Sequence, residues 1–526
     1  MLAEYEYECE QSARASRVRW AVFAAAIAHA AREFRDRPAM YSSTGWHFTF
    51  GELDRLTDEA AVGLSRRGVK HGDVVALALP STPDYVIAYG ALAKIGAISA
   101  GVNPKLAPPE RSTLVNECAQ ATHVIATDSL ASAMQIDAET IEVSIADHPD
   151  ALLSELRVRG ESPPALPYDR DRVVAIVFTS GTTGLPKGAV FTEQLLYNNA
   201  TVDIGNGWGE GGPITGNTQF CHVGFMAKVP AQFWAGTTYH VIEPWRTDVV
   251  LDTVARFRMP AIGGVAPQIA LLLRDPGFDN HDFRHTRLIV CGGAAAPGSL
   301  IREARERFSA DWTQRYALTE TGGSGCFTWI DALEEEMLYT VGHPRPGIEV
   351  QICDDDGQPL PHGEPGEVCL RSPSNMREYW RNPEATRRTL RDGWVHTNDQ
   401  GMIDERACLR LLGRRGDSYS RGGYVIFPKE AEHVLSWHPK VAQVTVVPRP
   451  DAIMGSIGVA IVVPRDPADP PLLDELRTFG AEHIAKFKLP EALRVVDGLP
   501  MTAMLKIDKR ALIRAEADVA ADTDAR

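Results

Sequence analysis

Hydrophobic and polar positions recur with two different periods along the first part of the chain. Residues 49–68 (TFGELDRLTDEAAVGLSRRG) follow the helical period, between a threonine that can cap a helix and a glycine that can end one. Short apolar runs at 73–80, 122–127 and 173–179 predict buried strands, and 84–100 predicts a helix, a glycine turn and another strand. Strands that alternate with helices favour a parallel, doubly wound sheet.

The middle of the chain repeats this alternation, with strands expected at 218–224, 237–243, 260–265 and 287–293. Residues 346–412 differ, because short strands separated by Asp-Gly and Pro-Gly turns predict a small antiparallel, barrel-like unit. We therefore expect an α/β protein whose large N-terminal domain contains two doubly wound, mainly parallel sheets and this small unit.

The pattern changes again near the segment GRRGD. Two helices and two strands predict a small α+β C-terminal domain there, at 428–438, 441–449, 458–464 and 472–484. The Ala/Asp-rich end, from about residue 517, is expected to be frayed. The expected division is an N-terminal domain at 1–413 and a C-terminal domain at 417–526, joined by residues 414–416.

Charge and cysteine usage narrow the function classes. The net charge of −15 argues against a nucleic-acid partner, since such proteins usually carry a basic patch. The apolar run at 20–31 is too short to span a bilayer and follows acidic residues, unlike a secretory signal, so we interpret it as a core helix. The eight cysteines form no C-x-x-C pair, which favours neither a zinc cluster nor a disulfide framework and fits a cytoplasmic protein.

The strongest chemical signal is the segment VFTSGTTGLPKGAV at 177–190. Its glycines allow the backbone N–H groups to face an anion, its hydroxyls add donors and its lysine adds a positive charge. This chemistry predicts a polyphosphate-binding loop after a buried strand. Its candidate ligands are Thr179, Ser180, Gly181, Thr182, Thr183, Gly184 and Lys187. A Walker A loop is excluded because Gly188, not serine or threonine, follows the lysine.

The nonapeptide S-G-T-T-G-L-P-K-G resembles the signature of the adenylate-forming enzymes, which include acyl- and aryl-CoA synthetases. Further motifs follow in that family's order, so the resemblance extends from about residue 45 to 512. It implies an ATP-dependent acid–thiol ligase that forms an acyl-AMP and passes the acyl group to a thiol. The implied cofactors are ATP, Mg²⁺ and coenzyme A.

Two segments are similar to the parts of this family that surround the nucleotide. For YALTETGG at 316–323, the resemblance implies that Tyr316 stacks on adenine, Thr319 contacts phosphate and Glu320 holds Mg²⁺. A carboxylate is the hard oxygen ligand that Mg²⁺ prefers. For CGGAAAPG at 291–298, it implies that Gly293 and Ala294 lie against adenine.

The segments GWVHTNDQG (393–401) and GRRGDSYSRGGY (413–424) resemble the ribose-binding and hinge signatures. Asp399 would accept hydrogen bonds from the ribose hydroxyls, because an ionised carboxylate is purely an acceptor. The resemblance makes Arg414 a ribose or phosphate ligand and Gly416 the hinge, so that 414–416 would join the N-terminal domain to a mobile C-terminal lid domain. Gly422 and Gly423 would let the backbone approach the thiol of coenzyme A. Asn398 stands where the family usually has glycine.

Lys506 matches the family's lysine for the adenylation step, where it would stabilise charge on the α-phosphate and the attacking carboxylate. Leu505 replaces the glycine that usually precedes this lysine. His222 matches a position beside the acyl pocket and is a candidate gate or catalytic residue. Lys228, six residues later, fits a surface lysine better than a substrate ligand.

The implied substrate is a small-molecule hydrophobic carboxylic acid, because the pocket candidates at 222–226, 263–265 and 292–295 are small or apolar apart from the histidine. Its identity is not determined. Two alternatives remain open: a ligase that loads a carrier protein, and a catalytically degenerate acyl- or nucleotide-binding relative. A homodimer is also compatible with the sequence.

Overall fold

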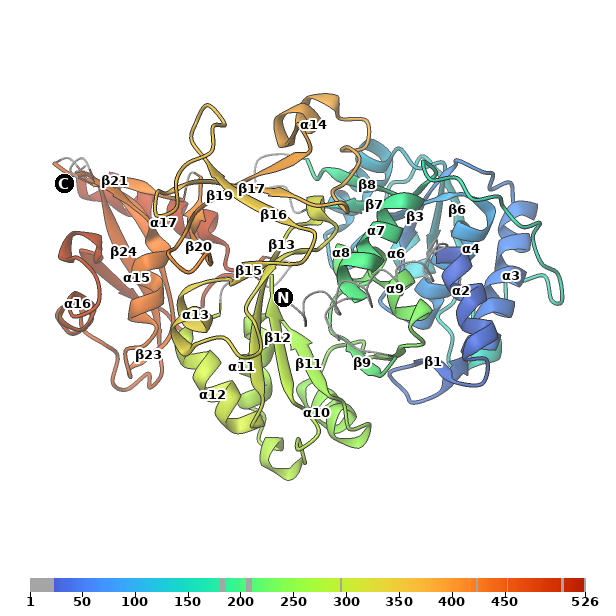
Figure 1. Ribbon diagram of the computed structural model, residues 1–526, viewed down its shortest axis with the longest axis horizontal. Helices are drawn as coiled ribbons and strands as arrows, with labels where there is room; N and C mark the ends of the chain where they lie inside the picture. Colours follow the sequence, from blue (N-terminus) through green and yellow to red (C-terminus); the bar gives the residue numbers. More distant parts are fainter. Residues whose placement is uncertain are drawn as a thin grey trace, which may run out of the picture.

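The computed structural model describes residues 23–179, 185–204, 211–293, 296–415, 417–421, 424–451, 453–502 and 506–524. Figure 1 shows two unequal parts, with the large N-terminal part in blue to yellow and a smaller C-terminal part in orange to red. Several mixed sheets build the large part. The predicted α/β class with a small C-terminal domain is confirmed.

The first sheet has six strands in the order β6-β5-β3-β4-β7-β8, and only β8 is antiparallel to its neighbour. The strands are β3 Val74–Ala78, β4 Ile98–Gly101, β5 His123–Ala126, β6 Glu139–Glu142, β7 Val173–Phe178 and β8 Gly188–Thr192. Alternate residues of one strand belong to different cores: Val75 and Leu77 join one cluster, Val74 and Ala76 the other. A sheet that is buried on both faces explains the continuous apolar runs of its strands.

Helices cover both faces of this sheet (Figure 1). They are α2 Phe23–Glu33, α3 Phe50–Arg66, α4 Pro83–Ile95, α5 Pro108–Thr113, the π-helical turn η1 Leu114–Ala119, α6 Asp128–Ala131 and α7 Glu193–Ile204. The threonine start predicted for α3 is a capping box: the Glu52 amide donates to Thr49 Oγ1 (3.2 Å), and the Thr49 amide donates to Glu52 Oε2 (2.8 Å).

The second large sheet has the order β11-β12-β13-β14-β15, with the first three strands parallel and the last two antiparallel. Its strands are β11 Ala261–Gly264, β12 Leu288–Gly292, β13 Asp311–Ala317, β14 Gly325–Phe327 and β15 His343–Pro344. The helices of this region are α10 Thr247–Arg256, α11 Ala266–Leu273, α12 Gly298–Phe308 and α13 Glu334–Tyr339. They share one apolar core with the sheet, centred on the fully buried Trp312.

A four-stranded sheet, β2-β1-β10-β9, lies between these two and was not predicted as a separate layer. Its strands are β1 Pro38–Tyr41, β2 His47–Thr49, β9 Pro213–Gly216 and β10 Thr238–Val241. The prediction of a strand at 218–224 is wrong, because β9 ends at Gly216 and helix α8 (Val223–Met226) begins within that segment. Helix α9 (Val229–Trp234) follows. A short apolar run is compatible with a buried turn or helix as well as with a strand; here Phe220 is buried in a turn and Phe225 in α8, with their rings stacked 3.8 Å apart.

Residues 346–412 form the antiparallel unit that the turns predicted. It consists of β16 Glu349–Cys353, β17 Gly366–Arg371, β18 Leu390–Arg391, β19 Trp394–Ile403 and β20 Leu409–Arg414, with helix α14 Pro383–Thr389 before β18. Strand β19 pairs with both β17 and β20, and therefore lies at the centre of the unit. It carries the segment predicted to bind ribose.

The C-terminal part contains a three-stranded sheet, β23-β24-β25, and a two-stranded ribbon, β21-β22. Its elements are β21 Tyr419–Arg421, β22 Tyr424–Ile426, α15 Pro428–Leu435, β23 Val441–Asp451, β24 Gly455–Pro464, α16 Leu473–Ala481, β25 Ala492–Val495 and α17 Lys509–Asp524. The expectation of a frayed end from about 517 is wrong, since α17 continues as a helix to Asp524.

Aromatic side chains hold the C-terminal part against the second large sheet. Trp437, just after α15, packs edge-on against Tyr339 of α13 with ring centroids 5.3 Å apart. Its indole also lies close to α12, where a Cβ on Gly298 would come within 2.5 Å of Trp437 Nε1. Ser299 Oγ donates to the Ser436 carbonyl across the same boundary at 3.3 Å. These contacts fix the orientation in which the C-terminal part faces the strands.

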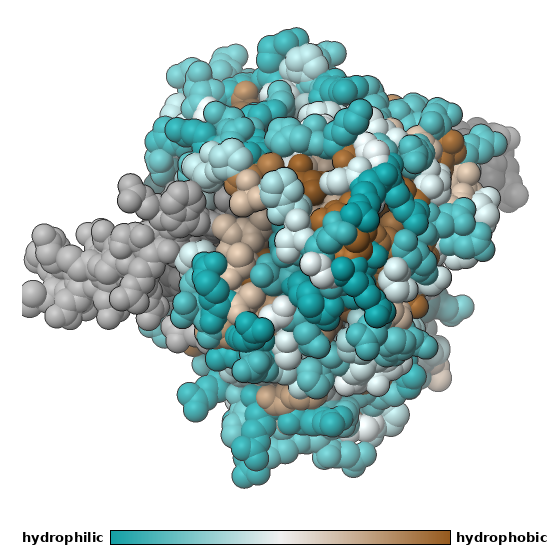
Figure 2. Space-filling view, turned by 90° about the vertical axis from the view of Figure 1, so that its right-hand side faces the viewer, coloured by the Kyte–Doolittle hydropathy of each residue, from teal (hydrophilic) through white to brown (hydrophobic). Residues whose placement is uncertain are grey.

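The surface is mainly hydrophilic. Figure 2, which looks at the right-hand side of Figure 1, shows hydrophobic residues in patches separated by hydrophilic ones. None of the helices in the described part of the chain combines the length and apolar character that a membrane span requires.

Candidate active site

One cavity of about 2740 Å³ contains the candidate site. It opens where strands of both large sheets end and where the C-terminal part faces them. In open α/β sheets, ligands bind beyond the carboxyl ends of the strands. Every predicted site residue that the structure describes lines this cavity: Thr179, Lys187, His222, Gly293, Tyr316, Thr319, Glu320, Asp399, Arg414 and Lys506. Ser180, Gly181, Thr182, Thr183, Gly184, Ala294, Gly416, Gly422 and Gly423 lie outside the described residues.

Asp399 joins two of the other predicted nucleotide ligands directly. Tyr316 donates its hydroxyl hydrogen to Asp399 Oδ2 at 2.7 Å, and Arg414 Nε donates to Asp399 Oδ1 at 3.0 Å. Burial, together with the charge of Asp399, raises the pKa of Tyr316 well above its ordinary value. Burial opposes the charge of Arg414, yet the attraction of Asp399 outweighs it and raises the pKa of the guanidinium. Since a carboxylate accepts about four hydrogen bonds, Asp399 can still bind a ribose hydroxyl.

The backbone before Asp399 adopts a left-handed turn. Asn398 has φ of 58°, a conformation that asparagine tolerates better than most residues, so the replacement of the family's glycine preserves the turn. Glu367 of β17 supports this turn: its Oε1 accepts a hydrogen bond from the Asn398 amide at 2.9 Å, and its Oε2 lies 3.0 Å from His396 Nδ1. Glu367 was not predicted as a site residue, because it is 32 positions before Asp399 and matches no motif that we identified.

Glu320 is oriented by a residue that the sequence analysis missed. The Tyr379 hydroxyl donates to Glu320 Oε1 at 2.5 Å, and Lys187 Nζ lies 5.0 Å from the centre of the Tyr379 ring. Burial and the negative charge of Glu320 raise the pKa of Tyr379. Tyr379 therefore connects the lysine of the 177–190 segment with the carboxylate predicted to hold Mg²⁺. A carboxylate that lines the cavity and has one oxygen held in this way fits a hard divalent cation.

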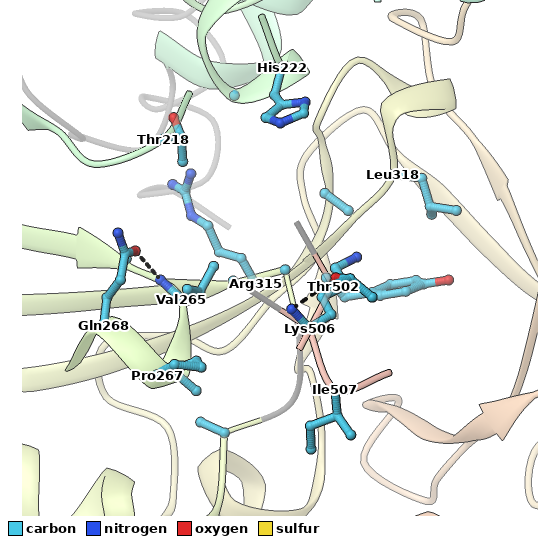
Figure 3. A pocket seen from close by; sticks show the side chains of 18 of the residues that line it. Thr218, His222, Val265, Pro267, Gln268, Arg315, Leu318, Thr502, Lys506 and Ile507 are labelled. Carbon is cyan, nitrogen blue, oxygen red and sulfur yellow. Dashed lines mark hydrogen bonds between the residues drawn. The ribbon is translucent and has the colours of Figure 1, made fainter. Parts of the chain in front are cut away.

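Lys506 extends from the C-terminal part into the cavity (Figure 3). Its backbone is held by Thr502, whose amide donates to the Lys506 carbonyl at 2.7 Å. The side chain keeps access to water through the cavity, but burial still lowers its pKa, and the nearby cation Arg414 lowers it further. Asp399 and Glu320 act in the opposite direction. Lys506 is thus within electrostatic range of both predicted nucleotide-binding carboxylates.

His222 lies at the opposite side of the cavity from the C-terminal part. Its Nε2 is 3.4 Å from Asn103 Nδ2, at the loop after β4. Burial, followed by the charge of Lys506, lowers the pKa of His222 to about 4, so its ring is neutral near pH 7. A neutral imidazole at this position can accept or donate a hydrogen bond but supplies no charge.

The expectation that Lys228 is a surface residue is wrong. Its residue exposure is 7%, it lines the same cavity, and its Nζ donates to Ser324 Oγ at 2.7 Å. Arg315 of β13 also lines the cavity and was not predicted as a site residue. The end of the cavity near His222 is therefore more polar than its sequence suggested.

Potential metal ligands also gather at two places. Within the described residues these are Glu336, His343 and Cys408, and Glu367, Cys369 and His396; in each group the ligand atoms lie within 4.8 Å of one another. Side-chain contacts within the groups, such as Cys369 Sγ to His396 Nδ1 at 3.4 Å, explain both arrangements without an ion.

The comparisons with known proteins agree with this geometry. A family profile described as "AMP-binding enzyme" matches residues 27–380, and one described as "AMP-binding enzyme C-terminal domain" matches residues 430–506. The chain is 31% identical to a fatty acid–[acyl-carrier-protein] ligase of Streptomyces coeruleorubidus, over 89% of this chain and 91% of the relative. It is also 31% identical to a feruloyl-CoA synthase of an Amycolatopsis species, over 88% and 93%. The solved structure of an amide bond synthetase from Marinactinospora thermotolerans superimposes with a TM-score of 0.83 at 26% identity, covering 94% of this chain and all of that one.

Proposed function

This chain belongs to the AMP-binding enzyme family and is an ATP-dependent ligase that activates a carboxylic acid as an acyl-AMP, and we propose that it transfers the acyl group to coenzyme A. The observation that carries the proposal is that Lys506, Glu320, Asp399 and Lys187, from four distant segments, line one cavity. The proposed reaction involves no nucleic acid. A cytoplasmic location of the protein remains a prediction.

In the first half-reaction, the substrate carboxylate attacks the α-phosphorus of ATP and pyrophosphate leaves. Phosphoryl transfer depends mainly on positioning and on neutralising charge. Lys506 would stabilise the charge shared by the α-phosphate and the attacking carboxylate. Asp399 and Arg414 would bind the ribose, and Tyr316 and Gly293 would contact adenine. Thr319, Lys187 and the hydroxyls of the 177–190 segment would bind the phosphates.

Mg²⁺ would supply charge neutralisation to the leaving pyrophosphate when it is bound. Glu320 would hold it, and the hydrogen bond from Tyr379 supports this role because it fixes one carboxylate oxygen and leaves the other for the ion. His222 would act beside the acyl group as a neutral polar contact.

In the second half-reaction, a thiol attacks the acyl carbon and AMP leaves. Lys506 and the thiol cannot use the same space, so we propose that the lid at 417–526 rotates against the domain at 1–413 about a hinge at 414–416. Gly422 and Gly423 would then face the thiol. The contacts of Trp437 with Tyr339 and of Ser299 with Ser436 would break in this rotation, which would free the site for the thiol.

The relatives named above differ in the group that accepts the acyl chain, since they are a carrier-protein ligase, a CoA synthase and an amide bond synthetase. Coenzyme A is favoured because relatives that match most of this chain include a feruloyl-CoA synthase, a long-chain-fatty-acid–CoA ligase and an indoleacetate–CoA ligase. The carrier-protein alternative rests on the acyl-carrier-protein relative, which matches almost the whole chain.

The test is acid-dependent exchange of labelled pyrophosphate into ATP, followed by thioester formation with coenzyme A or with a phosphopantetheinylated carrier protein. We expect exchange with a suitable acid and thioester with coenzyme A. If pyrophosphate exchange occurs and the carrier protein receives the acyl group, but no coenzyme A thioester forms, the acceptor is a carrier protein instead of coenzyme A. Complete absence of exchange over a broad acid panel would support the degenerate relative instead.

A further inference from the structure

Helix α15 of the C-terminal part brings a cation to the cavity to which the family resemblance gives no role. Lys429 is the second residue of this helix and lines the cavity. Its side chain forms no hydrogen bond and no ion pair with any residue that the structure describes. The ammonium group is therefore available to a ligand.

The two glutamates nearest to this lysine in sequence are already paired with other lysines. Glu430 accepts a hydrogen bond from Lys488 Nζ at 2.6 Å, and Glu432 Oε1 accepts one from Lys509 Nζ at 2.6 Å. The same oxygen of Glu432 also accepts hydrogen bonds from a hydroxyl and a backbone amide of β23. These carboxylates hold the C-terminal part together and leave the charge of Lys429 uncompensated by its own helix.

The start of α15 lies against the end of strand β20. Phe427, the residue before the helix, has its Cδ1 4.0 Å from the position of a Cβ on Gly413. The next residue, Arg414, is opposite Asp399 in the pairing of β20 with β19. Lys429 follows Phe427 by two positions, so it enters the cavity on the side of the residues predicted to bind ribose.

The electrostatic setting of Lys429 agrees with this placement. Burial lowers its pKa, and Asp399 supplies the largest of the opposing charges, ahead of Glu432 and Asp417. None of these carboxylates forms an ion pair with the lysine. Lys429 and Lys506 are also within electrostatic range of each other, since Lys429 lowers the pKa of Lys506. Because a partly buried cation without an acceptor is unfavourable, an acceptor supplied by the ligand would stabilise it.

We propose that Lys429 binds the nucleotide from the lid and donates a hydrogen bond to a ribose hydroxyl of ATP while Lys506 occupies the site. This inference rests on the proposed function. A hydroxyl has one hydrogen and two lone pairs, so the same ribose hydroxyl can donate to Asp399 and accept from the ammonium group. Lys429 then contributes to nucleotide binding, whereas Lys506 stabilises the transition state.

The position of Lys429 on the lid restricts its role to the first half-reaction. Asp399 belongs to the domain at 1–413 and stays with the ribose when the lid rotates. Lys429 moves away together with Lys506. The AMP part of the acyl-AMP thus loses one hydrogen bond before the thiol attacks, which favours release of AMP afterwards.

The first experiment removes the charge and compares the two half-reactions. Lys429→Met keeps a side chain of similar length but has no donor, whereas Lys429→Arg keeps the charge. With an acid that supports pyrophosphate exchange in the unaltered protein, we expect Lys429→Met to raise KM for ATP by about 30-fold and to change kcat by less than about threefold. Lys429→Arg should raise this KM by no more than about fivefold, and thioester formation from supplied acyl-AMP should change by less than about twofold in both variants.

The matched control is Lys488→Met. It removes a lysine that is paired with Glu430 of the same helix, and so disturbs α15 without removing a cation from the cavity. This variant should leave KM for ATP unchanged. An equal rise of KM in both variants would show that Lys429 acts only through the stability of α15.

The second experiment removes the proposed acceptor instead of the donor. KM would be measured for 2′-deoxy-ATP and 3′-deoxy-ATP with the unaltered protein and with Lys429→Met. If Lys429 binds one ribose hydroxyl, the rise of KM caused by Lys429→Met should fall below about threefold with the analogue that lacks this hydroxyl and persist with the other analogue.

The outcomes separate this inference from the function on which it rests. An undiminished effect of Lys429→Met with both analogues, an unchanged KM for ATP, or equal losses in the two half-reactions would each overturn the inference and leave adenylation intact. Failure of exchange in the unaltered protein with every acid would overturn the proposed function. Calorimetric binding of ATP, 2′-deoxy-ATP and 3′-deoxy-ATP in the absence of an acid would then still decide whether Lys429 binds the ribose.

Discussion

The two ends of the cavity differ in how their charges are arranged. At the nucleotide end, which we define by Tyr316, Glu320, Asp399, Arg414 and Lys506, cations and carboxylates alternate: Arg414 pairs with Asp399, and Lys506 lies within range of both carboxylates. The opposite end, which we call the acyl end and define by Thr218, His222, Lys228, Gln232 and Arg315, also lines the cavity and is less uniformly charged, because it includes neutral side chains and a histidine with a lowered pKa. We expect ATP to occupy the nucleotide end with every acid, while the acyl end faces the part of the substrate that varies. Substitutions at the first end should therefore affect every acid alike, whereas those at the second should not.

The largest effect is expected for Lys506→Ala. Loss of a charge that stabilises the transition state should lower acyl-AMP formation by about 1,000-fold, or about 4 kcal/mol, to the same extent with every acid. Thioester formation from supplied acyl-AMP should be nearly unchanged, because the lysine leaves the site in that step. Single-turnover assays of each half-reaction would measure this, with Lys440→Ala, a lid lysine paired with Asp469, as the control. Equal loss in both steps would contradict the division of roles.

The second effect concerns acid sensitivity at the acyl end. Burial lowers the pKa of His222 from 6.5 to about 4, so the unfolded chain binds a proton more readily than the folded one in that range. The contribution of the neutral His222 ring to the free energy of unfolding is therefore fully present above pH 6.5. It is lost as the pH falls toward 4, which lowers the free energy of unfolding by roughly 3 kcal/mol. In urea unfolding at several pH values, His222→Asn should lose less stability than the unaltered protein over this window. The pKa of His240 is also lowered to about 4, so His240 still contributes to the acid sensitivity of His222→Asn. The variant His240→Asn serves as the comparison. Identical pH dependence of all three proteins would refute the assignment.

The third prediction concerns Tyr379→Phe, which tests the hydrogen bond from Tyr379 to Glu320 at the nucleotide end. A hydrogen bond to a charged group typically contributes about 2 kcal/mol, so removing the hydroxyl from Glu320 should lower kcat/KM for ATP by about 30-fold. The loss should be the same for every acid that the protein activates, and the amount of Mg²⁺ needed for half-maximal rate should rise. Tyr168→Phe, which removes an exposed hydroxyl bonded to Gln194, is the matched control. A loss confined to one class of acid would place Tyr379 functionally at the acyl end.

The same contrast explains which features could be predicted from the sequence. The strands β3, β5 and β7, the capped helix α3 and the antiparallel unit follow from local patterns, and the nucleotide-end residues lie in contiguous motifs. Tyr379 and Glu367 could not be predicted, because each acts through a contact with a residue that is distant in sequence. Lys228 and Arg315 carry no motif, and burial of a lysine is rare enough that a surface position was the better expectation. The strand predicted at 218–224 is wrong because the buried Phe220 and Cys221 lie in a turn between β9 and helix α8.

The smallest effect should come from Glu367→Gln, which tests whether Asp399 depends on support from outside its motif. Glutamine keeps one acceptor oxygen but replaces the other with a donor, so it can satisfy the Asn398 amide or His396 Nδ1 but not both in the present arrangement. The left-handed turn at Asn398 would loosen, and Asp399 would spend less time oriented toward the ribose. We expect KM for ATP to rise about fivefold, or about 1 kcal/mol, with kcat nearly unchanged and with every acid affected equally. Glu349→Gln, at an exposed glutamate paired with Arg371 on the neighbouring strand, should leave KM unchanged. A lower melting temperature without a change in KM would show that Glu367 only stabilises the sheet, whereas a change that depends on the acid would mean that the two ends are coupled through β19.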